Sequence, residues 1–215
     1  MTTAFDRLAE RYHERLPGII RATLLDYGVS SEVIERRRLG WHRESVTVPV
    51  ESADGHVAFF EMWDAAEIGI AGEANGPVDL YPRAALTPTP KRLIVAEGIH
   101  EALVFESHGF QAVAATGSGL FFKAREWGPL LRRTPEVVLA YRRGEREAPG
   151  KYLPSRAEVI ARVSEAVPHA RLLEWPEAVG DDGGAYEFFA QQRRTADDFE
   201  RLLQTHLRTD DRPRW

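Results

Sequence analysis

The chain has 215 residues, 43% of them hydrophobic and 28% charged, which is typical of a globular protein with a sizeable core. It contains no cysteine, which excludes disulfide bonds and thiolate zinc sites, and its net charge of −5 argues against indiscriminate binding to nucleic acid. No apolar run approaches the roughly 20 residues that cross a bilayer, and the first residues lack the basic and apolar regions of a signal peptide. We therefore expect a cytoplasmic protein with no membrane partner.

The first part of the chain predicts helices followed by a β-hairpin. Apolar residues at spacings of three and four indicate helices over residues 4–38, with a natural stop at Gly28. Alternating valines over 45–63, interrupted by the turn residues 53–55, predict two antiparallel strands. Residues 64–90 are rich in glycine, proline and alanine and are interpreted as a long connection with little pattern.

From residue 91 the pattern changes to strands that alternate with helices. Strands are predicted at 92–96, 111–115, 136–141 and 170–174. Helices are predicted between them at 99–108, 120–132 and 155–166, and the charged tail from 191 is predicted as one helix with a frayed end. Such alternation implies a largely parallel sheet with right-handed crossovers. The predicted fold class is therefore α/β. We predict three units: a small α+β subdomain over 1–90, the parallel sheet flanked by helices over 91–190, and the terminal helix and tail over 191–215.

One carboxylate stands where open α/β sheets keep their ligand sites. The apolar run 93–96 ends abruptly in Glu97-Gly98, and a helical pattern starts at once. Ligands of such sheets bind at the carboxyl ends of the strands, and a glycine leaves room beside the carboxylate for a metal ion or a phosphate. Glu97 is therefore the first candidate for a catalytic or metal-binding residue.

Several short motifs resemble, in their order along the chain, the Toprim module of bacterial, phage and plasmid primases and the segments that precede it. They are the lead-in Leu24–Ser30, the hairpin motif Val48–Val50 with Asp54-Gly55, the pair Glu97-Gly98, and the segments Gly109–Ala114 and Val137–Tyr141. The resemblance spans most of residues 10–190. It implies a Toprim-like sheet, a link to DNA replication or a mobile element, and single-stranded nucleic acid or nucleotides as partners, with a helicase or another replication protein as a further candidate.

In that family the Toprim acids hold Mg²⁺ or Mn²⁺ for phosphoryl transfer, chemistry that needs several oxygen ligands converging on the cations. By position, the resemblance assigns the first family acid to Glu97, and Glu101 follows one helical turn later on the same side. These two residues are the catalytic candidates. The family's Asp-x-Asp pair falls on Arg142 and Gly144, so both aspartates are replaced.

A permanent cation at position 142 opposes a metal ion. An arginine stays charged in proteins, and at about 4 Å it repels another unit charge by about 4 kcal/mol at an effective dielectric constant of about 20. A metal site would have to be rebuilt from Glu97 with Glu145 and a later loop acid, Asp181 or Asp182.

Basic residues offer a different chemistry. The pair Arg142-Arg143 could occupy the place of the metal and bind a phosphate directly. Lys91 and Arg83 are the nearest other basic residues and complete the predicted contacts to nucleic acid or phosphate.

Three hypotheses for function stay open. The first is a primase-related protein with a degenerate Toprim site, which binds nucleic acid or nucleotides without efficient primer synthesis. The second is a Mg²⁺-dependent nucleotidyl transferase or nuclease that uses a rearranged acidic site. The third is a non-catalytic protein-interaction module that kept the fold and lost the chemistry.

Overall fold

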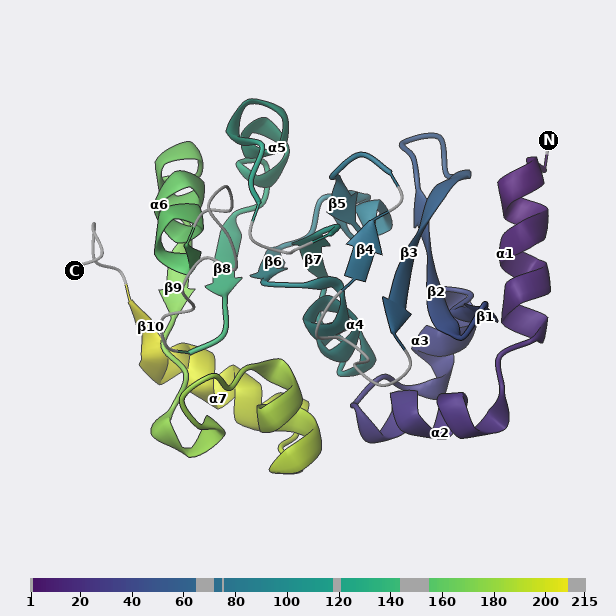
Figure 1. Cartoon of the computed structure of the whole chain (residues 1–215). Coiled ribbons are helices and arrows are strands. Elements are labelled where there is room, and N and C mark those ends of the chain that lie inside the picture. The colour runs from purple at the N-terminus through teal and green to yellow at the C-terminus, as the bar shows by residue number, and fades with distance from the viewer. Residues whose placement is uncertain (1, 65–71, 75, 118–120, 144–154, 209–215) are drawn as a thin grey trace.

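The computed structural model describes residues 2–64, 72–74, 76–117, 121–143 and 155–208. Within these ranges the chain forms a four-stranded sheet of order β1-β2-β3-β4 and a six-stranded sheet of order β10-β9-β8-β6-β7-β5. The smaller sheet and helix α1 lie at one side of the molecule, and the larger sheet with its helices fills the other side (Figure 1). The predicted α/β class, a parallel-rich sheet flanked by helices, is confirmed.

Three helices open the chain, as predicted. They are α1 (Ala4–Glu14), α2 (Gly18–Asp26) and α3 (Ser31–Arg36). Thr3 and Asp6 form a capping box at the start of α1, and the Ser30 hydroxyl accepts from the amide of Val33 at the start of α3, so these two helices begin where a side chain satisfies a free amide. Gly28 follows α2 at φ +87°, a conformation that glycine adopts without strain.

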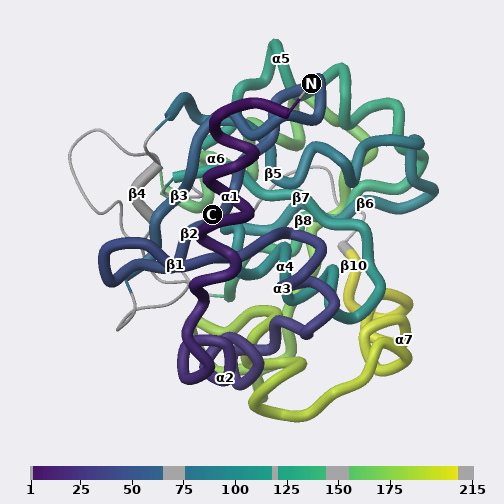
Figure 2. Tube along the Cα trace, turned by 90° about the vertical axis from the view of Figure 1, so that its right-hand side faces the viewer, coloured from purple at the N-terminus to yellow at the C-terminus, as the bar shows by residue number. Residues whose placement is uncertain are grey.

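The predicted hairpin forms the centre of the smaller sheet. Its antiparallel strands are β1 (Gly40–His42), β2 (Ser45–Glu51), β3 (Val57–Asp64) and β4 (Gly72–Ala74). Helix α1 lies across this sheet, as the turned view in Figure 2 shows, and buries Val57 and Phe60 on one face. The opposite face packs against helices of the larger unit, which is why β2 is buried on both sides along most of its length.

The interpretation of 64–90 as a patternless connection is wrong in part. This stretch contains β4, β5 (Leu80–Tyr81) and the 3-10 helix Arg83–Leu86. Strands of two or three residues are too short to show an alternating pattern, so the sequence gives no periodic signal for them. Residues 65–71 and 75 lie outside the described ranges.

The larger sheet follows the predicted strand–helix alternation closely. Its strands are β6 (Arg92–Ala96), β7 (Ala112–Ala115), β8 (Glu136–Ala140) and β9 (Arg171–Leu173), with parallel pairing of β7–β6, β6–β8 and β8–β9. The helices are α4 (Ile99–Ser107), α5 (Ala124–Leu131), α6 (Arg156–Ala166) and α7 (Ala196–His206). The tail is not one helix alone, because β10 (Leu207–Arg208) follows α7 and pairs antiparallel with β9, while β5 closes the other edge.

Two hydrophobic layers hold this sheet. Alternate residues of β6 and β8, such as Ile94 and Val138, join one layer with α4 and α7, while Leu93 and Val137 join the other with α5 and α6. Full burial of each such side chain contributes about 1.5–3 kcal/mol. The first layer also contains Leu24 and other residues from the N-terminal segment. The division of the chain at residues 90 and 190 stays a prediction. None of the described helices is long and apolar enough to span a bilayer.

Candidate functional site

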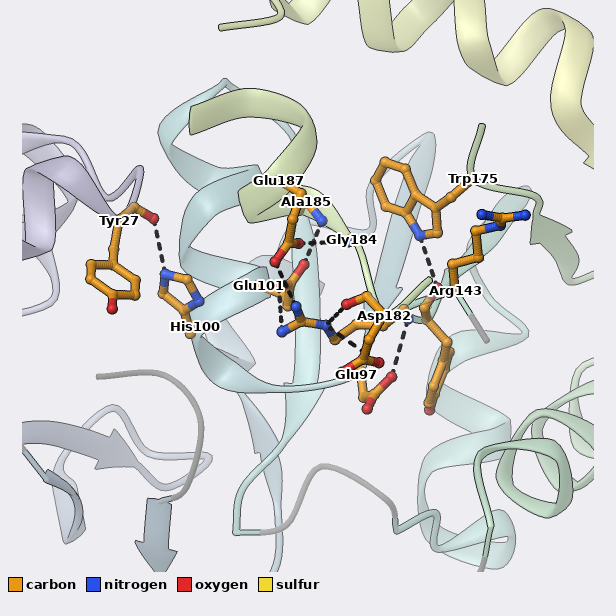
Figure 3. Close-up of polar contacts among 12 residues, drawn as sticks. Tyr27, Glu97, His100, Glu101, Arg143, Trp175, Asp182, Gly184, Ala185 and Glu187 are labelled. Atoms are coloured by element: carbon orange, nitrogen blue, oxygen red, sulfur yellow. Dashed lines mark hydrogen bonds and ion pairs between the residues drawn. The ribbon is translucent and has the colours of Figure 1, made fainter. Parts of the chain in front are cut away.

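Two neighbouring parallel strands bring charged residues together at the carboxyl edge of the larger sheet. β6 and β8 end opposite each other, so Glu97 and Arg142 emerge from adjacent strands, where α/β sheets place their sites. The chain returns to this edge after β9, since the amide of Arg143 donates to the carbonyl of Gly183 at 2.8 Å. Glu97, Glu101, Asp182 and Glu187 thereby gather in one place (Figure 3).

The carboxylate of Glu97 is held by an arginine from α6. Nε of Arg156 donates to Oε2 of Glu97 at 2.6 Å, and Nη2 donates to Oε1 at 3.0 Å. The two side chains are only 4% and 6% exposed. The backbone amide of Arg142 adds a third bond to Oε2 at 3.1 Å. Burial alone would lower the pKa of Arg156, but the bonds and charges of Glu97 and Asp182 together outweigh that effect and raise it, so the guanidinium that holds Glu97 stays charged.

The two guanidinium groups also bind the other acids at this edge. Arg156 donates from Nη2 to Oδ1 of Asp182 at 3.0 Å. Arg142 donates from Nε to the carbonyl of Asp182 at 2.8 Å and from Nη2 to Oε1 of Glu187 at 2.7 Å. Oε2 of Glu187 in turn accepts from the amide of Gly184 at 2.7 Å. Arg142 and Arg156 therefore lie between carboxylates, in the position where a cation would neutralise them.

Glu101 is the least compensated acid of the group. Its side chain is buried, Oε2 accepts from the amide of Ala185 at 2.6 Å, and Oε1 has no hydrogen-bond partner within the described part of the chain. Nη1 of Arg142 is 3.7 Å from Oε1, too far for a hydrogen bond. Burial raises the pKa of Glu101 to about 7, the nearby Arg142 offsets this only in part, and the charge of Glu187 adds to the rise.

His100 lies beside this group but does not join it. Its ring is buried, and Nε2 is 3.0 Å from the carbonyl oxygen of Tyr27 (Figure 3). Burial lowers the pKa of His100 to about 4, so the ring is neutral at physiological pH. The ring packs edge-on to Tyr27 and Trp63, which gives it a structural place in the core.

Arg143 faces the exposed side of the same edge. Its guanidinium lies 3.4 Å from Asp181 and 3.9 Å from Glu177, and both of those acids are almost fully exposed. Asp181 is thus paired with Arg143, whereas Asp182 is paired with Arg156. Glu145, the remaining predicted metal ligand, lies outside the described residues.

Lys91 and Arg83 do not join Arg142 and Arg143. Lys91 is exposed at the amino end of β6, the edge opposite to Glu97. Nη1 of Arg83 donates to both carboxylate oxygens of Asp79, at 2.8 and 2.7 Å, in the connection before β6. The structure thus separates the predicted basic contacts into two groups at opposite ends of the sheet.

No protein-family model and no curated protein sequence matches this chain. Solved structures do. A structure of the zinc-binding and RNA polymerase domains of the Aquifex aeolicus primase has a TM-score of 0.72 and 16% identity, over 94% of this chain and 59% of that one. The chain has the fold of a primase catalytic core.

Two further primase structures are similar in fold to this chain. The DnaG primase catalytic domain bound to single-stranded DNA has a TM-score of 0.69 and 19% identity, over 94% of this chain and 77% of that one. The E. coli primase catalytic core gives the same TM-score and identity, with 78% of that chain covered. The chain spans 59% of the Aquifex structure, which is therefore considerably longer. The suspected Toprim primase-like architecture is confirmed at the level of fold.

The residues at this edge do not fit the Mg²⁺ or Mn²⁺ that the resemblance implies. Both oxygens of Glu97 are engaged by a guanidinium, and Arg142 lies within 4 Å of Glu101. A unit charge at that distance opposes each charge of an incoming cation by about 4 kcal/mol at an effective dielectric constant of about 20. In the ranges that the structure describes, no group of three or more histidine, cysteine, aspartate or glutamate side chains is arranged to hold a metal ion.

Two residues of the site were not predicted from the sequence. Arg156 is the first residue of α6, and only its neighbour Ser155, the helix cap, gave a local signal. Glu187 begins the π-helix Glu187–Gln191, where no apolar period or turn motif marks a functional position. Both act through contacts with residues 45 to 59 positions away in sequence, which a local pattern does not encode.

Proposed function

We propose that this chain is a primase-related protein of DNA replication or of a mobile element that binds single-stranded nucleic acid without synthesising primers. The observation that carries the proposal is the bidentate pair between Glu97 and Arg156, both almost fully buried, with Arg142 beside it. An ion-pair network takes the place of the metal centre, so the primase fold persists without its phosphoryl-transfer chemistry.

The network opposes metal-dependent catalysis energetically. Glu97 would have to release Arg156 before it could bind a cation, and breaking a buried ion pair typically costs about 3–5 kcal/mol. Each guanidinium would then remain close to the incoming charge. Metal-dependent nucleotidyl transfer needs several free oxygen ligands on the cation, whereas the oxygens of Glu97 and Glu187 are already occupied.

Binding of a single strand is supported by the likeness to a primase catalytic domain that was solved with single-stranded DNA. Arg143 is the arginine at the site that is best placed to contact a phosphate. Its ion pairs with Asp181 and Glu177 are long and lie in solvent, where such pairs contribute little. Arg142, in contrast, is fixed by two short hydrogen bonds.

Two assays on the full chain test the proposal. Primer synthesis on a single-stranded template with Mg²⁺ or Mn²⁺ should give no product, and fluorescence anisotropy with a labelled single strand should show binding that weakens steeply with salt. Metal-dependent primer synthesis that Glu97→Gln abolishes would overturn the proposal. Single-strand binding that is equally tight at low and high salt would overturn the proposed contact between Arg143 and a phosphate.

The same assays separate the two alternative functions. A nucleotidyl transferase or nuclease with a rearranged site requires a metal-dependent product or cleavage that is lost in Glu97→Gln. A pure protein-interaction module requires that single strands do not bind even at low salt. No contact among the described residues favours either alternative over the proposed function.

A further inference from the structure

An open cleft lies at the end of the larger sheet that is opposite to the ion-pair network. Its volume is about 300 Å³, the lower end of the range for ligand pockets. The turn between β2 and β3, the 3-10 helix Arg83–Leu86 with the segment after it, and the end of α5 form its walls. The β2–β3 turn and α5 both lie at the top of the molecule in Figure 1.

Hydroxyl groups without partners line this cleft. The side chain of Thr134 is 1% exposed, yet its Oγ1 has no hydrogen-bond partner within the described ranges. An unsatisfied buried hydroxyl costs about 1–3 kcal/mol, so native structures seldom keep one without a reason. Thr87 and Thr89, on the wall formed after the 3-10 helix, are exposed, and no side-chain hydrogen bond occupies them in the part of the chain that the structure covers.

The charges that line the cleft leave an excess of one positive charge. Glu51 is neutralised by Arg38, whose Nη2 donates to it at 2.9 Å. Arg83 is balanced by Asp79, which engages Nη1 and leaves Nε and Nη2 without a partner among the described residues. Arg133 is exposed and forms no ion pair or hydrogen bond through its side chain within those residues.

We propose that this cleft binds a phosphate group. A guanidinium with unused donors, a second guanidinium without a partner among the described residues, and threonine side chains line it, and a phosphate accepts several charge-assisted hydrogen bonds from such groups. The volume admits a phosphate with several further atoms, so the group can belong to a mononucleotide or to the backbone of a strand. The proposal does not depend on the proposed function, because the cleft shares none of its lining residues with the ion-pair network.

Amide chemical shifts of the full-length, ¹⁵N-labelled chain test the proposal. Inorganic phosphate should change the amide chemical shifts of Thr89 and Thr134 in a saturable way. A titration up to about 10 mM reaches ten times a Kd of about 1 mM. Adenosine monophosphate and a single strand without terminal phosphates, titrated separately, identify the source of the group, since the one that perturbs these amides at the lower concentration is the preferred ligand. Absence of saturable shifts with all three would overturn the proposal.

Matched variants show whether the predicted groups form the site. Arg133→Gln should weaken phosphate binding at least tenfold, whereas Arg125→Gln, an exposed arginine at the other end of α5 with no partner in the described ranges, should leave it unchanged. Thr134→Val should weaken binding several-fold and leave the thermal midpoint equal or higher, because it removes an unsatisfied hydroxyl. Equal affinity in all of these proteins, or a Thr134→Val protein that is less stable and binds normally, would contradict the assignment.

Discussion

The two ends of the larger sheet use polar side chains in opposite ways. At the carboxyl edge, both arginines are paired: Arg142 with Glu187 and Arg156 with Glu97. One buried oxygen there, Oε1 of Glu101, has no hydrogen-bond partner in the described part of the chain. At the amino edge, Arg133 and the buried hydroxyl of Thr134 have no partner within the described residues. The carboxyl edge is where an α/β fold is expected to bind its ligand. The difference teaches that the position of a site in a fold does not establish its chemistry, whereas free donors and acceptors indicate where a ligand can bind.

The largest expected effect comes from breaking the carboxyl-edge pair. Arg156→Ala leaves Glu97 buried without its bidentate partner, and we expect the free energy of unfolding to fall by about 3–5 kcal/mol. Urea denaturation of the purified variant and of the wild type at one pH measures this difference.

A double variant distinguishes the ion pair from simple loss of packing. Glu97→Gln combined with Arg156→Met removes both charges and keeps similar volumes, so most of the lost stability should return. A double variant as unstable as Arg156→Ala would indicate that the shape of Arg156, not its charge pairing, stabilises this edge.

Glu101 makes the carboxyl edge sensitive to pH. Its pKa is raised from the usual 4.5 to about 7, so between these values the folded state holds a proton that the unfolded state has lost, and stability contributed by the group falls as pH rises. The shift corresponds to roughly 3 kcal/mol. Glu101→Gln carries no titrating proton, so the stability of this variant relative to wild type should rise by about that amount from pH 4.5 to pH 8.

His100 also contributes to the pH dependence of stability. Its lowered pKa of about 4 makes folded stability rise between about pH 4 and 6.5, in the direction opposite to that of Glu101, so the wild-type curve alone will look nearly flat there. The difference between variant and wild type isolates Glu101, because His100 contributes to both. A difference that is constant from pH 4.5 to 8 would show that the Glu101 carboxyl titrates normally.

A smaller effect is expected where the backbone approaches the network. A Cβ at Gly184 would lie 2.8 Å from Oε2 of Glu101 and 3.1 Å from Cγ of Arg142, and both side chains are held by other bonds. Gly184→Ala should therefore cost about 1–3 kcal/mol in urea denaturation. Gly18→Ala, where a Cβ meets nothing within 4 Å, is the control and should not lose stability. Equal effects of Gly184→Ala and Gly18→Ala would mean that the side chains around Gly184 move aside without a cost in stability.

The smallest effect on stability is expected at Arg143. Its ion pairs are long and exposed, so Arg143→Gln should change the free energy of unfolding by less than about 0.5 kcal/mol. The same change should lower the salt slope of single-strand binding by about one. Arg201→Gln, on the exposed face of α7, is the matched control. An unchanged slope in Arg143→Gln would place the strand elsewhere, and the amino-edge cleft with its phosphate-binding groups would be examined next.

Most of the architecture could be predicted from the sequence because its signals are local. The apolar run before Glu97 predicted the observed bounds of β6, and the predicted helix 155–166 begins at Ser155, which the structure shows to cap α6. The short strands β4, β5 and β10 could not be predicted, because pairing with a neighbour, and not a periodic pattern, forms them.

The candidate site could be predicted only in part. The order of motifs placed Glu97, Glu101 and Arg142 at one edge, and the structure brings these residues together with Asp182. Arg156 could not be predicted, since nothing in a capped amphipathic helix indicates that its first residue reaches a carboxylate 59 positions earlier. Without Arg156 the sequence left open whether Glu97 was free for a metal ion.

Calorimetric titration of Mn²⁺ into the wild type and into Glu97→Gln tests the central claim most directly. Because Arg156 is bound to both carboxylate oxygens of Glu97 and Arg142 lies 3.7 Å from Glu101, the account predicts no saturable binding that depends on Glu97, and identical traces for the two proteins. Saturable binding to the wild type that disappears in Glu97→Gln would contradict it, because the acids would then have exchanged their arginines for a metal.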